Sequence, residues 1–236
     1  MNDIDKEGEE ILNSIAVAKN FNEWMCSKLE PYSSQKILEI GSGIGNISQF
    51  LIKNNKDLVL SDLRNQYIKY LEQKFPKNKI IQLNLVDPNF KEKYKDHLNK
   101  YQLVFALNVI EHIQDDKLAM ENINKLLKPG GFSFILVPAY GFLFNHLDKS
   151  LDHFRRYNKR KLKAIMPKDF KTIKTYYFNF VGIFGWFLTG TILRKKTIPK
   201  SNMILYNKLV PLFKFIDLIL LNKVGLSVIN ISQKKL

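Results

Sequence analysis

The chain has 236 residues, of which 45% are apolar, and a formal net charge of +15. This length and apolar content predict one domain with a full hydrophobic core and exclude extensive disorder. The single cysteine, Cys26, excludes an internal disulfide and, with no metal-ligand cluster in the sequence, favours a reducing compartment and no bound metal. The acidic, polar first ten residues are the opposite of a secretory signal, so we expect a cytoplasmic protein.

The charge is unevenly distributed. Residues 1–40 carry 4 basic and 8 acidic side chains, whereas residues 151–200 carry 13 basic and 2 acidic ones. Clustered positive charge favours anionic partners such as phosphorylated substrates, lipid headgroups or nucleic acid. A solvated, lysine-rich face without a partner is the alternative interpretation.

The predicted elements begin with one or two helices across residues 4–30, which end before Pro31 and are placed to cover a ligand. From residue 37 onward, β-type apolar runs alternate with helical stretches. This alternation predicts a parallel sheet with helices on both faces. The predicted strands cover 37–40, 57–61, 79–83, 102–107 and 132–137, and the predicted helices cover 45–53, 64–74, 90–99 and 115–127.

The first predicted strand ends near Glu39 and leads into three glycines at alternate positions, Gly41, Gly43 and Gly45. Bare glycines permit a tight turn and a close approach of backbone N–H groups to a ligand, and a side chain at Gly41 or Gly43 would fill that space. Asp62 ends the next strand, where a carboxylate can accept hydrogen bonds from both hydroxyls of a ribose. The pattern predicts a nucleoside-bearing cofactor, and a glycine-rich turn without a ligand is the alternative.

Four motifs in order, E-x-G-x-G-x-G, I-I-Q-L-N-L-V-D, L-V-F-A-L-N-V-I-E-H-I and L-L-K-P-G-G-F-S-F-I-L-V-P-A, resemble those of class I S-adenosylmethionine-dependent methyltransferases. The resemblance covers residues 37–138. It implies a Rossmann-like, seven-stranded, mostly parallel sheet with helices on both faces, S-adenosyl-L-methionine as cofactor, and a turn at Lys128–Gly131 before the fifth strand. The implied cofactor-binding residues are Glu39 facing a cationic ligand group, Gly41, Ser42, Gly43, Gly45, Asp62, Leu63, Asn84 and Leu85 beside the adenine, and Asn108 and Val109 at the methionine end.

Two histidines are candidates for the catalytic base, because an oxygen nucleophile must lose its proton during methyl transfer. We predict His153, in D-H-F-R-R-Y, and keep His112, in N-V-I-E-H-I, as the alternative. Arg155, Arg156 and Tyr157 are predicted to bind an anionic substrate, since arginine suits bidentate recognition of phosphate or carboxylate. Pairing of these arginines with acids of the fold is the other interpretation.

The C-terminal part departs from the generic pattern. A helix to about Met166, a strand-like run near 170–180 and an alternating stretch at 225–234, typical of an edge or last strand, predict the sixth and seventh strands. Residues 181–223 then form an apolar insertion, which includes a helix over 203–221 that contains Pro211. The uncharged run over 175–193 has a length that suits a bilayer span, but its glycines and polar residues argue against one. The insertion is expected in a membrane interface, on the sheet or against a second subunit.

These features predict one methyltransferase domain over residues 1–236, with N-terminal helices (1–35), a cofactor-binding core (36–139) and a substrate-side half (140–236). Residues 146–234 resemble, more weakly, methyltransferases found alone or fused to glycosyltransferases of cell-surface glycan pathways. That resemblance implies methyl transfer to an oxygen of a small or lipid-linked, anionic or sugar-type metabolite at the inner membrane face, with a homodimer as one assembly.

Two other functions are open. The basic residues allow an RNA or DNA methyltransferase. Against it, N-V-I-E-H stands where amino-nitrogen nucleic-acid methylases carry a proline-aromatic signature. A non-enzymatic binding protein on a methyltransferase fold is the third hypothesis, because a fold alone does not establish an activity.

Overall fold

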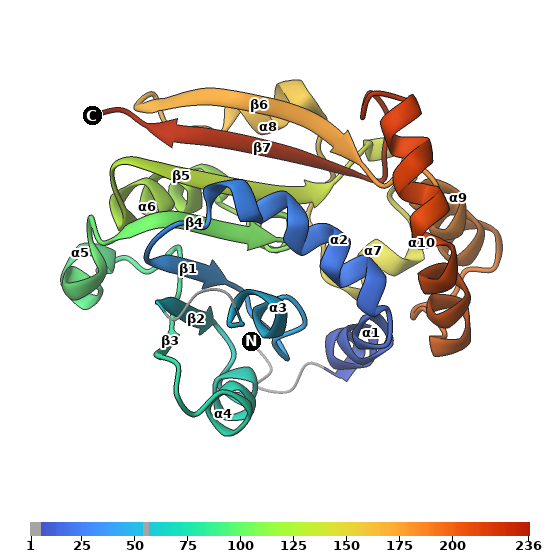
Figure 1. Ribbon diagram of the computed structural model, residues 1–236, viewed down its shortest axis with the longest axis horizontal. Coiled ribbons are helices and arrows are strands. Elements are labelled where there is room, and N and C mark those ends of the chain that lie inside the picture. Colours follow the sequence, from blue (N-terminus) through green and yellow to red (C-terminus); the bar gives the residue numbers. More distant parts are fainter. Residues whose placement is uncertain (1–5, 54–56) are drawn as a thin grey trace.

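The computed structural model describes residues 6–53 and 57–236, so positions 4 and 5 of the predicted N-terminal helix lie outside the described residues. Seven strands form one sheet in the order β3-β2-β1-β4-β5-β7-β6 (Figure 1). The strands β1 to β5 pair in parallel, and β7 is antiparallel to both of its neighbours. This arrangement confirms the predicted fold class. The strands are β1 (Ile37–Ile40), β2 (Leu58–Asp62), β3 (Ile80–Gln82), β4 (Tyr101–Leu107), β5 (Leu127–Pro138), β6 (Phe170–Phe178) and β7 (Ser227–Lys234).

The C-terminal strand is the last strand but not an edge. β7 lies between β5 and β6, so β6 forms that edge of the sheet. Its central position explains its burial, with Val228 and Ile229 inaccessible to solvent. The segment Lys128–Gly131, predicted as a turn, belongs to β5, where Gly130 has φ +74° and the register against β4 shifts.

The helices differ from the predicted ones mainly in length. The predicted helix at 45–53 is only α3, because the positive φ of +74° at Gly45 is incompatible with a helix start there. The predicted helix at 90–99 divides into α5 and a short 3₁₀ turn at Lys95–His97. The α-helices are α1 (Lys6–Ala16), α2 (Lys19–Leu29), α3 (Ser48–Leu51), α4 (Asn65–Lys74), α5 (Phe90–Lys93), α6 (Asp116–Leu126), α7 (His146–Ser150), α8 (Lys159–Ala164), α9 (Gly182–Trp186) and α10 (Lys200–Ile219).

Two hydrophobic cores lie on opposite faces of the sheet, because successive strand residues point to opposite sides. Val104 and Ala106 of β4 belong to the core that α6 and α8 cover. Leu103 and Phe105 belong to the other core, which α2, α3 and α10 cover. Side chains are buried on both faces, as the near-continuous apolar runs of the parallel strands indicate.

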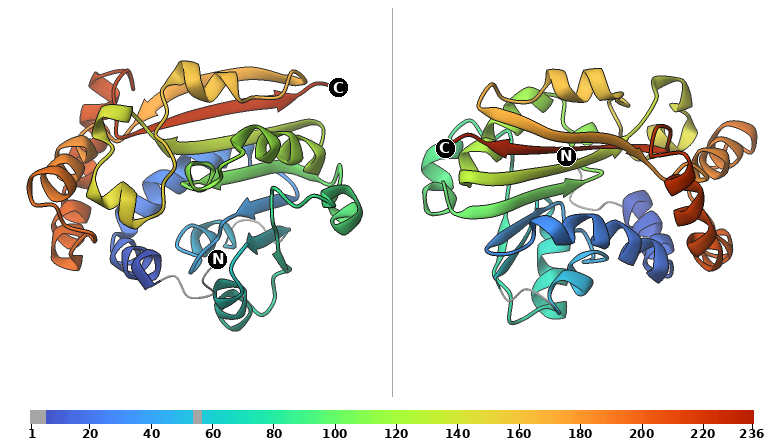
Figure 2. Two further views of the ribbon diagram at one scale, coloured as in Figure 1. Left: turned by 180° about the vertical axis from the view of Figure 1, so that it is seen from behind. Right: turned by 45° about the horizontal axis from the view of Figure 1, so that its top comes forward.

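The predicted insertion between β6 and β7 consists of α9, a π-helical segment η5 (Phe187–Ile192) and α10. These elements gather at one end of the molecule, beside α1 and α2 (Figures 1 and 2). The side chain of Asn207 in α10 accepts a hydrogen bond of 3.2 Å from the backbone N–H of Phe21 in α2. Among the described residues, no helix combines the length and hydropathy that a membrane span requires.

Candidate active site

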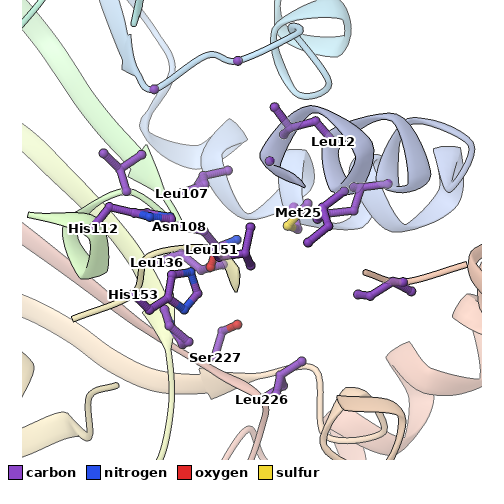
Figure 3. A pocket seen from close by; sticks show the side chains of 18 of the residues that line it. Leu12, Met25, Leu107, Asn108, His112, Leu136, Leu151, His153, Leu226 and Ser227 are labelled. Carbon is purple, nitrogen blue, oxygen red and sulfur yellow. The ribbon is translucent and has the colours of Figure 1, made fainter. Parts of the chain in front are cut away.

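A cavity of about 740 Å³ lies at the carboxyl ends of the parallel strands, where ligands of open α/β sheets bind. Its floor includes residues that follow β1, β2 and β4, namely Gly41, Leu63 and Asn108. Residues of helix α1 and of the insertion between β6 and β7 complete the lining of this cavity. In Figure 3, His112 and His153 approach the cavity from one side and Leu12 and Met25 from the other.

The glycine-rich loop after β1 is shaped by backbone conformation. Gly41, Gly43 and Gly45 all have positive φ, at +69°, +53° and +74°. A Cβ at Gly41 would lie 2.5 Å from Val109, and one at Gly43 would lie 2.9 Å from Leu12. The glycines are therefore required by φ and by neighbouring protein side chains, not only by ligand space as the sequence suggested. Gly43 nevertheless lines the cavity together with Gly41.

Three of the predicted cofactor residues, Glu39, Ser42 and Gly45, do not line the cavity. Ser42 ties the loop to β2, since its backbone N–H donates to the carbonyl of Ser61 at 2.8 Å. Gly45 lies against Phe75, the residue that caps the C-terminus of α4. Glu39 is buried and accepts a hydrogen bond from the hydroxyl of Ser48, and burial raises its pKa to about 8. The contact of Glu39 with a cationic ligand group stays a prediction.

Asp62 holds the same loop and also reaches the cavity. Its Oδ2 accepts a hydrogen bond of 2.9 Å from the backbone N–H of Gly43, and its Oδ1 accepts one of 3.0 Å from Arg64. Burial raises the pKa of this carboxyl group. Each carboxylate oxygen has a second lone pair, so the group can bind ribose hydroxyls while it fixes the loop.

The remaining predicted cofactor residues form a continuous wall. Asn84 and Leu85 follow β3, and Asn108 and Val109 follow β4. The backbone of Asn108 has a φ of +54°, which turns the chain sharply at the end of β4. Eight of the eleven predicted cofactor residues line the cavity: Gly41, Gly43, Asp62, Leu63, Asn84, Leu85, Asn108 and Val109.

His153 lines the cavity and is only 9% exposed. Its Nδ1 lies 2.8 Å from Oδ1 of Asp148, which leaves Nε2 as the ring nitrogen available to a substrate. Asp148 is itself fully buried at position N3 of α7. Burial alone would raise the pKa of Asp148, but hydrogen bonds from His153 and Arg156 outweigh it and hold the pKa below its ordinary value. An ionised Asp148 orients the imidazole and fixes the proton on Nδ1.

The residue pair Glu111 and His112 lies in a 3₁₀ turn after β4, against His153. The rings of His112 and His153 meet edge to face at 4.5 Å, and Glu111 Oε1 lies 3.9 Å from His153 Nε2. Burial lowers the pKa of His112 to about 3 and raises that of Glu111 to about 7. Both carboxylate oxygens of Glu111 lack a hydrogen-bond partner within the described part of the chain.

The same three residues, Glu111, His112 and His153, offer donor atoms within 4.8 Å of one another, a spacing from which a metal ion could be held. Two features oppose a dication there. Arg156 is close enough to Glu111 for its positive charge to lower that carboxyl's pKa. Hydrogen bonds from Arg156 and His153 also engage Asp148, the nearby ionised acid. The expectation that no metal is bound stays a prediction.

The three residues predicted to bind an anionic substrate lie in two different places. Arg156 lines the cavity. Its Nε donates a hydrogen bond of 2.8 Å to Asp148, and its guanidinium group stacks over the ring of Trp186 at 4.7 Å. Its Nη2 has no partner among residues 6–53 and 57–236. Arg155 and Tyr157 lie outside the cavity, where both pair with Asp116 at 2.7 Å. Both arginines therefore pair with acids of the fold, Arg155 with Asp116 and Arg156 with Asp148, and of the two only Arg156 also lines the cavity.

Sequence reasoning missed Asp148, which holds His153, and several cavity residues. Asp148 carried a local signal, because the run N-H-L-D predicts a capping box that would place it at a helix start; the structure contains this box. Trp186, Met203 and Tyr206 come from the insertion, and no spacing rule relates them to the glycine motif. They line the cavity together with Phe21 and Met25.

Known proteins share this architecture. Residues 38–133 match the family model of a methyltransferase domain. The ubiquinone biosynthesis O-methyltransferase of Pelagibacter ubique is 25% identical over 179 residues, which are 74% of this chain and 60% of that protein. The ribosomal RNA small subunit methyltransferase A of Malacoplasma penetrans is 25% identical over 117 residues, or 50% of this chain and 40% of that protein.

Solved structures agree on the fold. The crystal structure of a SAM-dependent methyltransferase from Archaeoglobus fulgidus superposes with a TM-score of 0.59 at 16% identity, covering 90% of this chain and 94% of that one. The chain spans less than two thirds of the length of the curated relatives named above. Over residues 38–133 the matched family model identifies a methyltransferase domain. The sheet order and the glycine loop with Asp62 are those of the class I, Rossmann-like methyltransferase fold, whose cofactor is S-adenosyl-L-methionine.

Proposed function

We propose that the protein transfers a methyl group to an oxygen of a small or lipid-linked, anionic or sugar-type acceptor, with His153 as the base. The observation that carries this proposal is that His153 lines the same cavity as Gly41 and Gly43 of the glycine loop and is oriented by the buried Asp148, whose Oδ1 lies 2.8 Å from its Nδ1. When bound, S-adenosyl-L-methionine supplies a methyl group activated by a sulfonium. The acceptor hydroxyl then forms the new oxygen–carbon bond, the electron pair of the broken carbon–sulfur bond returns to sulfur, and the proton passes to His153 Nε2.

His153 is favoured over His112 on two grounds. A general base works best when its pKa lies near the working pH, and burial lowers the pKa of His112 to about 3. Asp148 holds His153 in the tautomer that leaves Nε2 free to accept a proton. His112, which packs edge to face on the His153 ring, positions that ring.

The cavity also supports an acceptor with one polar and one apolar part. Arg156 lines the cavity with a guanidinium group suited to an anionic or hydroxyl-rich acceptor. Phe21, Met25, Met203 and Tyr206 line the remainder with apolar surface. The weak resemblance of the C-terminal half to methyltransferases of glycan pathways, and a relative named as an O-methyltransferase, are in keeping with this choice.

Methyl transfer to nucleic acid is the competing function, since one relative is named as a ribosomal RNA methyltransferase. A screen with labelled S-adenosyl-L-methionine distinguishes the two. We expect transfer to extracted lipid-linked or phosphorylated glycans and none to total RNA, with a methyl ether as product. Labelled RNA would overturn the proposed acceptor, and tight binding of S-adenosylhomocysteine with no transfer to any acceptor would support a binding protein instead.

A further inference from the structure

Helix α10 exposes more apolar surface than a helix in water normally does. Its buried side holds Met203, Val210, Phe213 and Asp217. The carboxylate of Asp217 accepts hydrogen bonds from the backbone N–H groups of Asn179 (2.6 Å) and Phe180 (2.8 Å). The outer side of α10 carries exposed lysines but is also largely apolar, with Leu205 exposed at 62% and Leu212 at 52%. A surface helix of a protein surrounded by water normally confines its apolar residues to the buried side.

The neighbouring segment η5 also exposes apolar side chains. It buries Thr189 and Gly190 and exposes Phe187 and Ile192. Thirteen of the twenty-one exposed large apolar side chains of the described chain lie in this one region, at the same end of the molecule (Figure 2). Such a concentration marks an interaction surface. We define the outer face of the insertion by these thirteen side chains: Phe184, Phe187, Leu188, Ile192, Leu193, Ile204, Leu205, Leu209, Leu212, Phe215, Leu218, Ile219 and Leu221.

The charge of this region identifies its partner. Residues 181–223 contain seven basic residues and one acidic residue, Asp217, which is buried. Within the insertion, the basic side chains therefore have no exposed acid beside them; the exposed acids of this end of the molecule belong to α1 and α2. A second copy of this chain would bring the same positive charge to a symmetric interface, which is unfavourable. The basic residues, all exposed, are Arg194, Lys195, Lys196, Lys200, Lys208, Lys214 and Lys223.

From this combination we infer that the outer face of the insertion docks into the interface of an anionic lipid bilayer. Apolar side chains that enter the acyl boundary, beside lysines that pair with headgroups, are the features of helices that lie in a membrane plane. The length of α10 and η5 does not oppose this, because neither helix has to cross the bilayer.

The same elements connect the outer face to the cavity. Trp186, Met203 and Tyr206 of the insertion line the cavity from within. A docked protein would therefore hold its cavity wall against the lipid surface, where an amphiphilic acceptor resides. This consequence rests on the function proposed above, whereas the docking itself can be measured without any methyl acceptor.

The test is flotation of the full chain with phosphatidylcholine vesicles, with and without about one third phosphatidylglycerol. We expect the wild type to float only with the anionic vesicles. Leu205→Gln/Leu212→Gln/Phe215→Gln should reduce binding by about tenfold or more, because all three side chains are exposed and belong to the outer face. Lys195→Gln/Lys196→Gln should reduce it several-fold and weaken its dependence on salt.

The matched control is Phe142→Gln/Ile173→Gln, which changes two exposed apolar residues outside the insertion and should leave vesicle binding unchanged. Failure of the wild type to float, equal binding to neutral vesicles, or a dimer in light scattering that only the triple variant dissociates would each overturn the inference. S-adenosylhomocysteine affinity is measured on every variant and should be unchanged. Vesicle binding without methyl transfer would contradict the proposed function but would still support the inference that the outer face of the insertion binds the membrane.

Discussion

The cofactor half and the substrate half of the cavity are built by different means. In residues 36–139, the loop that meets the cofactor is defined by backbone conformation: positive φ at Gly41 and Gly43, and backbone N–H groups that donate to Asp62. In residues 140–236, buried charged side chains hold one another, as Asp148 does with His153 and Arg156. Substitutions in the first half should therefore lower cofactor affinity, because they strain the loop. Substitutions in the second half should lower turnover, because they disturb proton transfer.

The largest effect should come from the substrate half. His153→Asn removes the proposed base, and we expect turnover to fall by about 10²- to 10⁴-fold. S-adenosylhomocysteine affinity should remain within a factor of about two, since the loop after β1 does not depend on His153. Steady-state methyl transfer and calorimetric titration check the two quantities.

His112→Asn is the comparison variant for this prediction. It should lower turnover less, because a histidine with a pKa of about 3 accepts a proton poorly. A larger loss in the His112 variant would move the base to that residue.

In the cofactor half, Gly41→Ala should weaken S-adenosylhomocysteine binding by about tenfold to a hundredfold, with strain of about 1–3 kcal/mol. The new Cβ would lie 2.5 Å from Val109, and the backbone φ of +69° disfavours any L side chain. Gly141→Ala is the matched control, since a Cβ there meets nothing within 4 Å. Equal affinities for both variants would show that the loop tolerates the strain.

The cofactor half was more predictable than the substrate half for a physical reason. A glycine loop and the strand-end position of Asp62 follow from local backbone rules that can be recognised in a sequence. Arg156 lies in the cavity and its neighbour Arg155 does not, because the two side chains leave the same extended segment in different directions. Those directions are set by tertiary contacts, of Arg156 with Asp148 and of Arg155 with Asp116.

The sheet shows the same limit. The alternating residues of β7 predicted a strand, but not its place between β5 and β6. That place depends on pairing with segments about 100 and 60 residues away along the chain, which no local pattern encodes.

A smaller effect should appear in stability against pH. Burial raises the pKa of Glu111 to about 7 from its ordinary 4.5, while neighbouring His153 and Arg156 pull it down and Asp148 pushes it up. The unfolded chain releases this proton near pH 4.5 and the folded one near pH 7, so stability falls as pH rises through that window.

Glu111→Gln cannot ionise and should escape this loss. We expect the variant to gain about 1–3 kcal/mol on the wild type between about pH 5 and about pH 8, measured by denaturant unfolding. The contribution of Glu39, whose pKa burial also raises, is common to both proteins and cancels in the difference. An advantage that is the same at every pH would show that Glu111 does not change its ionisation in this window.

The smallest expected effect is that of Arg155→Gln, and it separates the two neighbouring arginines. Arg155, which does not line the cavity, pairs with Asp116 at 2.7 Å and with the carbonyl of Gln114, so its loss should cost at most about 1 kcal/mol of stability and leave KM unchanged. Arg156→Gln should instead raise KM for an anionic acceptor, because the guanidinium group of Arg156 belongs to the cavity lining. If the Arg155 variant folds stably but has a raised KM, Arg155 contacts the substrate after all, and the acceptor lies partly outside the cavity.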